Sequence, residues 1–226
     1  MKAVDSASPL DLPGVLLVGI QALGLAVSEE QQQQLLAYMG LIQKWNKVYN
    51  LTALREPQEI LTHHLLDSLS AVKPLLRHLS SLDSGLGGVE VLDVGSGGGL
   101  PGVVISICCP HVRVTCVDAV SKKAAFVQQV AASLRLANLK GVHARVESLT
   151  GPFDVICSRA FASLSDFVAW SAGALSEKGV WMAMKGKVPH EEMALLPPGI
   201  GVFHVEQLQV PNLAADRCMI WLKKSV

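Results

Sequence analysis

A glycine-rich stretch at residues 91–102, Val-Leu-Asp-Val-Gly-Ser-Gly-Gly-Gly-Leu-Pro-Gly, carries the strongest chemical signal of the sequence. An apolar run leads into it, and a helical pattern follows. Glycines let the backbone approach a bound molecule closely, because they lack a side chain and tolerate positive φ. Backbone N–H groups at the start of the following helix can then face the ligand. We therefore expect a ligand at this turn.

One class of ligand compatible with the turn is a dinucleotide. Gly97, Gly99 and Gly102 have the spacing G-x-G-x-x-G, and Asp118 lies about 20 residues further on, as in dinucleotide-binding folds. A nicotinamide-dependent oxidoreductase is thus one alternative. The spacing alone is weak support, because short glycine patterns recur in unrelated proteins.

The other class is S-adenosylmethionine. Gly95, Gly97 and Gly99, led by Asp93, also fit the Asp-x-Gly-x-Gly-x-Gly loop of class I methyltransferases. A carboxylate beside the loop would repel a pyrophosphate and attract the ammonium and sulfonium of the methyl donor. Asp93 therefore favours S-adenosylmethionine, although it could instead cap the turn by accepting backbone N–H groups.

Two further strand ends could hold parts of such a cofactor. Asp118 ends an expected strand at 113–118, where a carboxylate can accept both ribose hydroxyls; alternatively it caps an expected helix at 121–137. Val146 and Glu147 lie at the end of an expected strand at 141–146 and could meet the adenine edge.

Composition excludes several classes. The 226 residues are 50% hydrophobic and 17% charged, as in an ordinary folded chain. Lys plus Arg equals Asp plus Glu at 19 each, which argues against a protein that coats nucleic acid by charge alone. Any contact with RNA would have to come from local basic patches. Five cysteines without ligand spacing indicate reduced thiols and no metal site. The apolar run at 12–27 is interrupted and lacks a basic leader. We expect a cytoplasmic protein without a membrane segment.

The elements that must position these residues fall into two groups. Ser28 and Gln31 fit a capping box before an amphipathic helix, and Pro57 begins a second helical segment whose inward face continues to Pro74. We predict a helical appendage at 1–80, a linker at 81–88 and a cofactor-binding domain at 89–226. Strands are expected at 89–94, 113–118, 141–146, 153–158, 179–185, 202–210 and 218–223.

The alternation of strands and helices predicts the fold class. Short β-branched runs separated by helical stretches indicate an α/β fold with a parallel sheet. The last two strands are joined without a helix, so we expect a seven-stranded, mostly parallel sheet with an antiparallel C-terminal hairpin strand. That arrangement is typical of class I (Rossmann-like) methyltransferases.

Several stretches together resemble the RsmG (GidB, glucose-inhibited division protein B) family. They are residues 43–52 (Gln-Lys-Trp-Asn-Lys-Val-Tyr-Asn-Leu-Thr), 64–69 (His-Leu-Leu-Asp-Ser-Leu), 99–102 (Gly-Leu-Pro-Gly), 158–162 (Ser-Arg-Ala-Phe-Ala) and 184–186 (Met-Lys-Gly). The resemblance spans roughly residues 28–223. It implies methyl transfer from S-adenosylmethionine to guanine N7 in 16S ribosomal RNA of the small ribosomal subunit. One departure is Gly98, where many relatives have proline.

The resemblance also implies site residues. Its cofactor-binding positions fall on Gly95, Leu100, Asp118, Ala119, Val146, Glu147 and Arg159. We expect Arg159 to orient cofactor and target at the end of the fourth strand. The second-tier candidates around the pocket mouth are Asn50, His64, Asp67 and Lys185.

Basic residues near the cofactor edge are candidates for RNA binding, although any one of them could be a solvated surface residue. They are Lys122, Lys123, Arg145 and Lys185. We expect a monomer acting on 16S ribosomal RNA or the small subunit. A non-catalytic ribosome-assembly factor that retains a cofactor pocket remains a further alternative.

Overall fold

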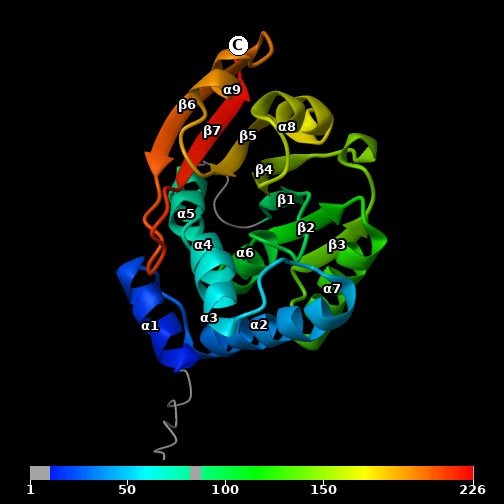
Figure 1. Ribbon diagram of the computed structural model, residues 1–226. Coiled ribbons are helices and arrows are strands. Elements are labelled where there is room, and N and C mark those ends of the chain that lie inside the picture. The colour runs from blue at the N-terminus through cyan, green and yellow to red at the C-terminus, as the bar shows by residue number, and fades with distance from the viewer. Residues whose placement is uncertain (1–10, 82–87, 226) are drawn as a thin grey trace, which may run out of the picture.

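The computed structural model describes residues 11–81 and 88–225 and contains one seven-stranded sheet (Figure 1). The strand order is β3-β2-β1-β4-β5-β7-β6. β1 to β5 are parallel, and β7 pairs antiparallel with both β5 and β6. The bounds are β1 Glu90–Val94, β2 Arg113–Asp118, β3 Leu139–His143, β4 Phe153–Arg159, β5 Leu175–Lys185, β6 Ile200–Gln207 and β7 Cys218–Lys224. The predicted fold class is confirmed.

Two of the predicted strands are displaced. The third strand ends at His143, and Val146 and Glu147 instead lie in a short 3-10 helix, η2 (Val146–Ser148). The sixth strand ends at Gln207, short of the predicted residue 210. Leu208 N–H still bonds the carbonyl of Arg217 at 2.7 Å, so pairing with the segment before β7 continues without a regular strand.

Between residues 11 and 81, six helical segments precede the sheet: α1 Leu12–Ala22, α2 Glu29–Tyr49, α3 Pro57–Ile60, the π-helix η1 Leu61–Leu66, α4 Asp67–Leu69 and α5 Val72–Ser80. The capping box is confirmed, since Ser28 and Gln31 exchange hydrogen bonds between side chain and backbone. The expected end at Pro74 was wrong. Pro74 is the third residue of α5, and a first-turn N–H has no intrahelical partner to lose.

The remaining helices connect or flank strands: α6 Gly102–Cys108, α7 Ser121–Ser133, α8 Leu164–Ser171 and α9 His190–Ala194. α7 is shorter than the predicted 121–137. Leu134 is its C-cap, and Arg135 follows at φ 55°, in the left-handed region where a helix cannot continue.

Buried side chains form a cluster on each face of the sheet. One joins residues from the helices before the sheet with α6, α7 and strand residues such as Val91; the other joins α8 with residues such as Leu92 and Val94. In Figure 1, α2 and α7 lie below the sheet and α8 above it. The predicted division into appendage and domain stays a prediction, and most of the expected linker at 81–88 lies outside the described residues.

Among the residues that the structure describes, no helix has both the length and the apolarity needed to cross a bilayer.

Candidate methyl-donor and target site

The site lies where the order of the sheet reverses. From β1 the chain proceeds outward to β2 and β3, then returns to β4 on the other side of β1. Loops leaving β1 and β4 at their carboxyl ends diverge there, which is where open α/β sheets bind ligands. The glycine loop follows β1, and Arg159 ends β4. Two pockets meet at Gly95, which lines both.

The first, which we call the nucleoside pocket, has a volume of about 290 Å³. Its lining residues are Val94, Gly95, Val117, Asp118, Ala119, Ala144, Arg145, Val146, Glu147, Phe161 and Trp170. The pocket thus brings together five predicted cofactor residues from the loop after β1, the end of β2 and η2: Gly95, Asp118, Ala119, Val146 and Glu147. Its walls are mostly apolar, with a carboxylate at one end, as an adenosine group requires.

Asp118 is held in place by the backbone. Its Oδ2 accepts the N–H of Gly97 at 2.9 Å, and its Oδ1 accepts the N–H of Val120 at 2.8 Å. Val120 is the N-cap residue of α7 and makes no side-chain cap, so the capping alternative for Asp118 holds only in part. Each carboxylate oxygen keeps a lone pair for a ribose hydroxyl.

Two aromatic residues of this pocket, Phe161 and Trp170, were not predicted. Their rings meet edge to face with centroids 5.8 Å apart. A Cβ on Gly95 would lie 2.2 Å from the Phe161 ring, and Gly95 has φ +64°. Only glycine fits there without displacement. Phe161 lies within the Ser-Arg-Ala-Phe-Ala stretch, which could have suggested it, whereas Trp170 lies on an amphipathic helix and carries no such signal.

The second, which we call the target pocket, has a volume of about 550 Å³. Its lining residues are Ile42, Leu51, Thr52, His63, His64, Asp67, Gly95, Ser96, Gly97, Gly98, Leu100, Lys123, Arg159, Ala160, Met184, Lys185, Gly186 and Arg217. Four of them are Lys or Arg and one is Asp, so the lining is cationic. Such a lining attracts carboxylate and phosphate groups.

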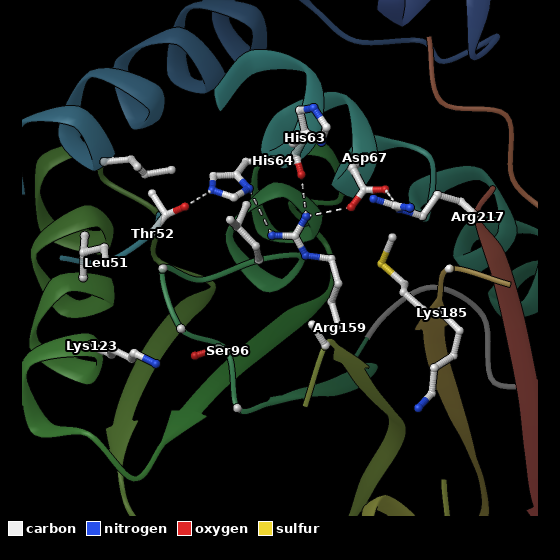
Figure 2. Close-up of a pocket in the computed structure, with 18 residues that line it drawn as sticks. Leu51, Thr52, His63, His64, Asp67, Ser96, Lys123, Arg159, Lys185 and Arg217 are labelled. Carbon is white, nitrogen blue, oxygen red and sulfur yellow. Dashed lines mark hydrogen bonds and ion pairs between the residues drawn. The ribbon is translucent and has the colours of Figure 1, made fainter. Parts of the chain in front are cut away.

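Arg159 is fixed from above by the helical segment that carries His63, His64 and Asp67 (Figure 2). Its Nη1 donates to Asp67 Oδ2 at 2.7 Å and to the His63 carbonyl at 2.8 Å. Asp67 is buried, and its Oδ1 accepts from Arg217 Nε at 2.8 Å. One carboxylate therefore joins the ends of two strands, and a buried carboxylate so paired holds both arginines in fixed orientations. Arg217 was not predicted.

His64 extends this network toward the glycine loop. Its Nδ1 lies 3.4 Å from Arg159 Nη2, and its Nε2 lies 2.7 Å from Thr52 Oγ1. Burial, followed by the Arg159 charge, lowers the His64 pKa to about 4, so the imidazole is neutral at pH 7. The carrier segment is a π-helix, a conformation often found at functional sites. Thr52 ends the stretch at 43–52 that resembles the family and is not among the predicted site residues.

The other polar candidates have different positions. Lys185 lines the target pocket but points away from Arg159 in Figure 2, donating to the Ala162 carbonyl and to Glu192. Asn50 is the left-handed C-cap of α2, is exposed, and lines neither pocket. The segment that follows α2 is held instead by the side-chain amide of Asn46. Its Oδ1 accepts the Thr52 N–H, and its Nδ2 donates to the Leu54 carbonyl.

The basic candidates are also dispersed. Lys123 lines the target pocket, 3.8 Å from Asp118, and Arg145 lines the nucleoside pocket. Lys122 lies over the Tyr49 ring, outside both pockets.

The sequence predicts that Asp93 faces the ligand, but in the structure this side chain is turned away from both pockets. It is 0% exposed and lines neither pocket. Its Oδ2 accepts the Gly102 N–H at 2.8 Å, so it ties down the start of α6. Burial raises its pKa to about 7. The turn-capping alternative for Asp93 is the one observed, and selection of a cationic donor by this carboxylate stays a prediction.

The glycine loop itself fits a closely bound ligand. A Cβ on Gly98 would meet nothing within 4 Å, so the loop is open on that side, and the Ser96 hydroxyl is buried without a partner among the described residues. Gly99 faces inward instead, where a Cβ would lie 2.4 Å from Val103. Tyr38 of α2 donates to the Gly98 carbonyl and supports the loop from behind.

Comparison with solved structures defines the class of the fold. A SAM-dependent methyltransferase from Aquifex aeolicus superposes with TM-score 0.55 at 17% identity, covering 76% of this chain and 96% of that one. Magnesium protoporphyrin IX methyltransferase (ChlM) from Synechocystis PCC 6803 superposes with TM-score 0.56 at 14% identity, covering 84% of this chain and 100% of that one. The fold is that of the class I methyltransferases.

Sequence comparison identifies the family. The family model described as rRNA small subunit methyltransferase G (GidB) matches residues 31–220. The Ribosomal RNA small subunit methyltransferase G of Acidovorax ebreus (strain TPSY) is 62% identical over 226 residues, 99% of each chain, and that of Polaromonas naphthalenivorans (strain CJ2) is 62% identical over 220 residues, 96% of this chain and 98% of the relative. The chain belongs to the rRNA small subunit methyltransferase G family. The predicted resemblance is confirmed, and the dinucleotide alternative was wrong.

Proposed function

We propose that this protein transfers a methyl group from S-adenosylmethionine to N7 of a guanine in 16S ribosomal RNA, acting as a monomer in the cytoplasm on RNA of the small subunit. The observation that carries the proposal is the pairing of two pockets at Gly95: an apolar one ending in a carboxylate and a larger cationic one. The first suits an adenosine group, and the second leaves room for a purine and nearby phosphate.

The residues present fit the cofactor. Asp118 would hold the ribose, the apolar walls of the nucleoside pocket would enclose the adenine, and the loop at 95–98 would face the methionyl part. The donor supplies an electrophilic methyl group on sulfur. The family relatives named above are methyltransferases of ribosomal RNA, which supports the same assignment.

Methylation at guanine N7 requires orientation and not proton removal. N7 carries a lone pair in the major-groove edge of guanine, so no general base is needed for the attack. What the chain must supply is a fixed geometry, which can account for much of the acceleration of such a reaction. The doubly anchored Arg159 and the neutral His64 provide rigid walls next to the loop.

The test is methyl transfer to small subunits isolated from cells that lack this protein. Tritiated methyl should appear in 16S RNA as N7-methylguanosine at one position, and Arg159→Ala should reduce turnover at least ~100-fold by loss of positioning. Arg113→Gln, at the amino end of β2 and outside both pockets, serves as the matched control. Binding of the cofactor without any transfer would instead favour a non-catalytic assembly factor.

A further inference from the structure

The Thr52 hydroxyl belongs to the lining of the target pocket and is held there by two contacts. Its Oγ1 contacts two nitrogen atoms: His64 Nε2 at 2.7 Å and the backbone nitrogen of Leu54 at 3.2 Å. The Leu54 group is an N–H and can only donate. The direction of the His64 contact depends on which imidazole nitrogen carries the hydrogen.

The neighbouring arginine fixes that choice. A guanidinium has donors only, so the His64 Nδ1 that faces Arg159 Nη2 must present its lone pair. The imidazole is neutral, because burial and the Arg159 charge lower its pKa to about 4. Its single N–H is therefore on Nε2 and donates to Thr52 Oγ1. The opposite tautomer would set an N–H against the guanidinium.

With both lone pairs of the Thr52 oxygen occupied, its own hydrogen is the one remaining hydrogen-bonding function. In the described part of the chain no other hydrogen bond involves this hydroxyl. Thr52 lines the target pocket, and its hydroxyl oxygen points toward His64 in Figure 2. The series Asp67, Arg159, His64, Thr52 thus ends in a hydroxyl whose hydrogen remains available for donation.

We propose that Thr52 is a specificity-determining residue whose hydroxyl donates to O6 of the target guanine while N7 stays free to accept the methyl group. Guanine presents two acceptors, N7 and O6, on this edge, whereas adenine presents an amino donor in place of O6. A donor without remaining acceptor capacity accepts guanine and rejects adenine. This inference rests on the proposed function.

The experiment combines substitutions in the enzyme with substitutions of the target base, as in a double-mutant cycle. The target guanosine, once located by the methylation mapping above, is replaced by inosine, which keeps O6, or by 2-aminopurine riboside, which keeps N7 and lacks O6. Small subunits containing each base are methylated by the wild type, Thr52→Val and Thr52→Ser. Initial rates at low substrate give kcat/KM for each pair, and calorimetry gives the affinity for S-adenosylmethionine.

Thr52→Val should lose about tenfold in kcat/KM on guanosine and on inosine and little on 2-aminopurine riboside, as expected for one hydrogen bond. Thr52→Ser should restore most of the activity, and cofactor affinity should stay unchanged in both variants. If Thr52 had only a structural role, Thr52→Val would lower kcat/KM equally for all three substrates, and that result would overturn the proposal. Wild type that leaves no N7-methylguanosine would overturn the proposed function itself.

Discussion

Asp93→Asn should make the protein more stable relative to wild type as the pH rises. The Asp93 carboxyl is completely buried, and its Oδ1 has no hydrogen-bond partner among the described residues. Burial therefore raises its pKa from 3.8 to about 7. Asparagine can still accept the Gly102 N–H through its side-chain oxygen but carries no charge at any pH.

The magnitude follows from linkage. The folded state binds the Asp93 proton more tightly than the unfolded state, so this stabilisation is complete below the unfolded pKa and is lost as the pH rises through the folded pKa. The interval from 3.8 to about 7 corresponds to about 4 kcal/mol in total. Between pH 5 and pH 8 the advantage of Asp93→Asn should therefore increase by about 3 kcal/mol.

Urea unfolding without cofactor, at pH 5, 6, 7 and 8, measures this difference. All other titrating groups are shared by the two proteins, so their contributions cancel when the free energies of unfolding are subtracted. Most of the change should fall below pH 7, and the difference should level off near pH 8. A constant difference, or one that decreases with pH, would refute the reasoning from burial.

Three other substitutions or conditions test the site. Gly95→Ala should weaken S-adenosylmethionine binding at least ~tenfold in calorimetry, because positive φ is costly for alanine and its Cβ would meet Phe161; Gly40→Ala in α2, whose Cβ meets nothing within 4 Å and which lines neither pocket, should bind normally. Arg159→Lys should lower kcat more than it changes cofactor affinity, since an ammonium cannot reproduce the two-sided guanidinium contact; equal losses in both would contradict a positioning role. The pH profile of kcat/KM should show no ionisation of His64 near pH 6.5, because its pKa is about 4; an inflection near 6.5 that disappears in His64→Gln would contradict its neutral state.

The sequence was sufficient where the signal is local. A strand followed by a glycine turn predicted the loop at 95–99, and the periodicity of the strands predicted the sheet. Alternation along β1 also contained information about Asp93. Asp93 is two residues from Val91 and therefore faces the same buried side, in register with Cys116 and Cys157. The glycine motif alone carries no such information, and it predicts Asp93 on the ligand side.

The contacts that organise the target pocket could not be predicted from local sequence patterns. Asp67, Arg159 and Arg217 come from three distant parts of the chain, and only the sheet brings β4 next to β5 and β5 next to β7. An Arg before a strand has no sequence signature for pairing with a buried carboxylate. Thr52 likewise gains its role from His64, whose protonation depends on burial.

The two pockets are built from different parts of the chain. Substitutions can therefore be chosen that affect one pocket and leave the other unchanged. Every residue lining the nucleoside pocket lies between 94 and 170, whereas five lining residues of the target pocket lie between 51 and 67. Asp67 links the two parts, since its carboxylate forms ion pairs with arginines from both β4 and the segment before β7. Removing a partner from a buried ion pair typically costs about 3–5 kcal/mol, so the helical segment cannot shift without displacing Arg159. Substitutions at 51–67 should therefore impair use of the RNA target while S-adenosylmethionine still binds.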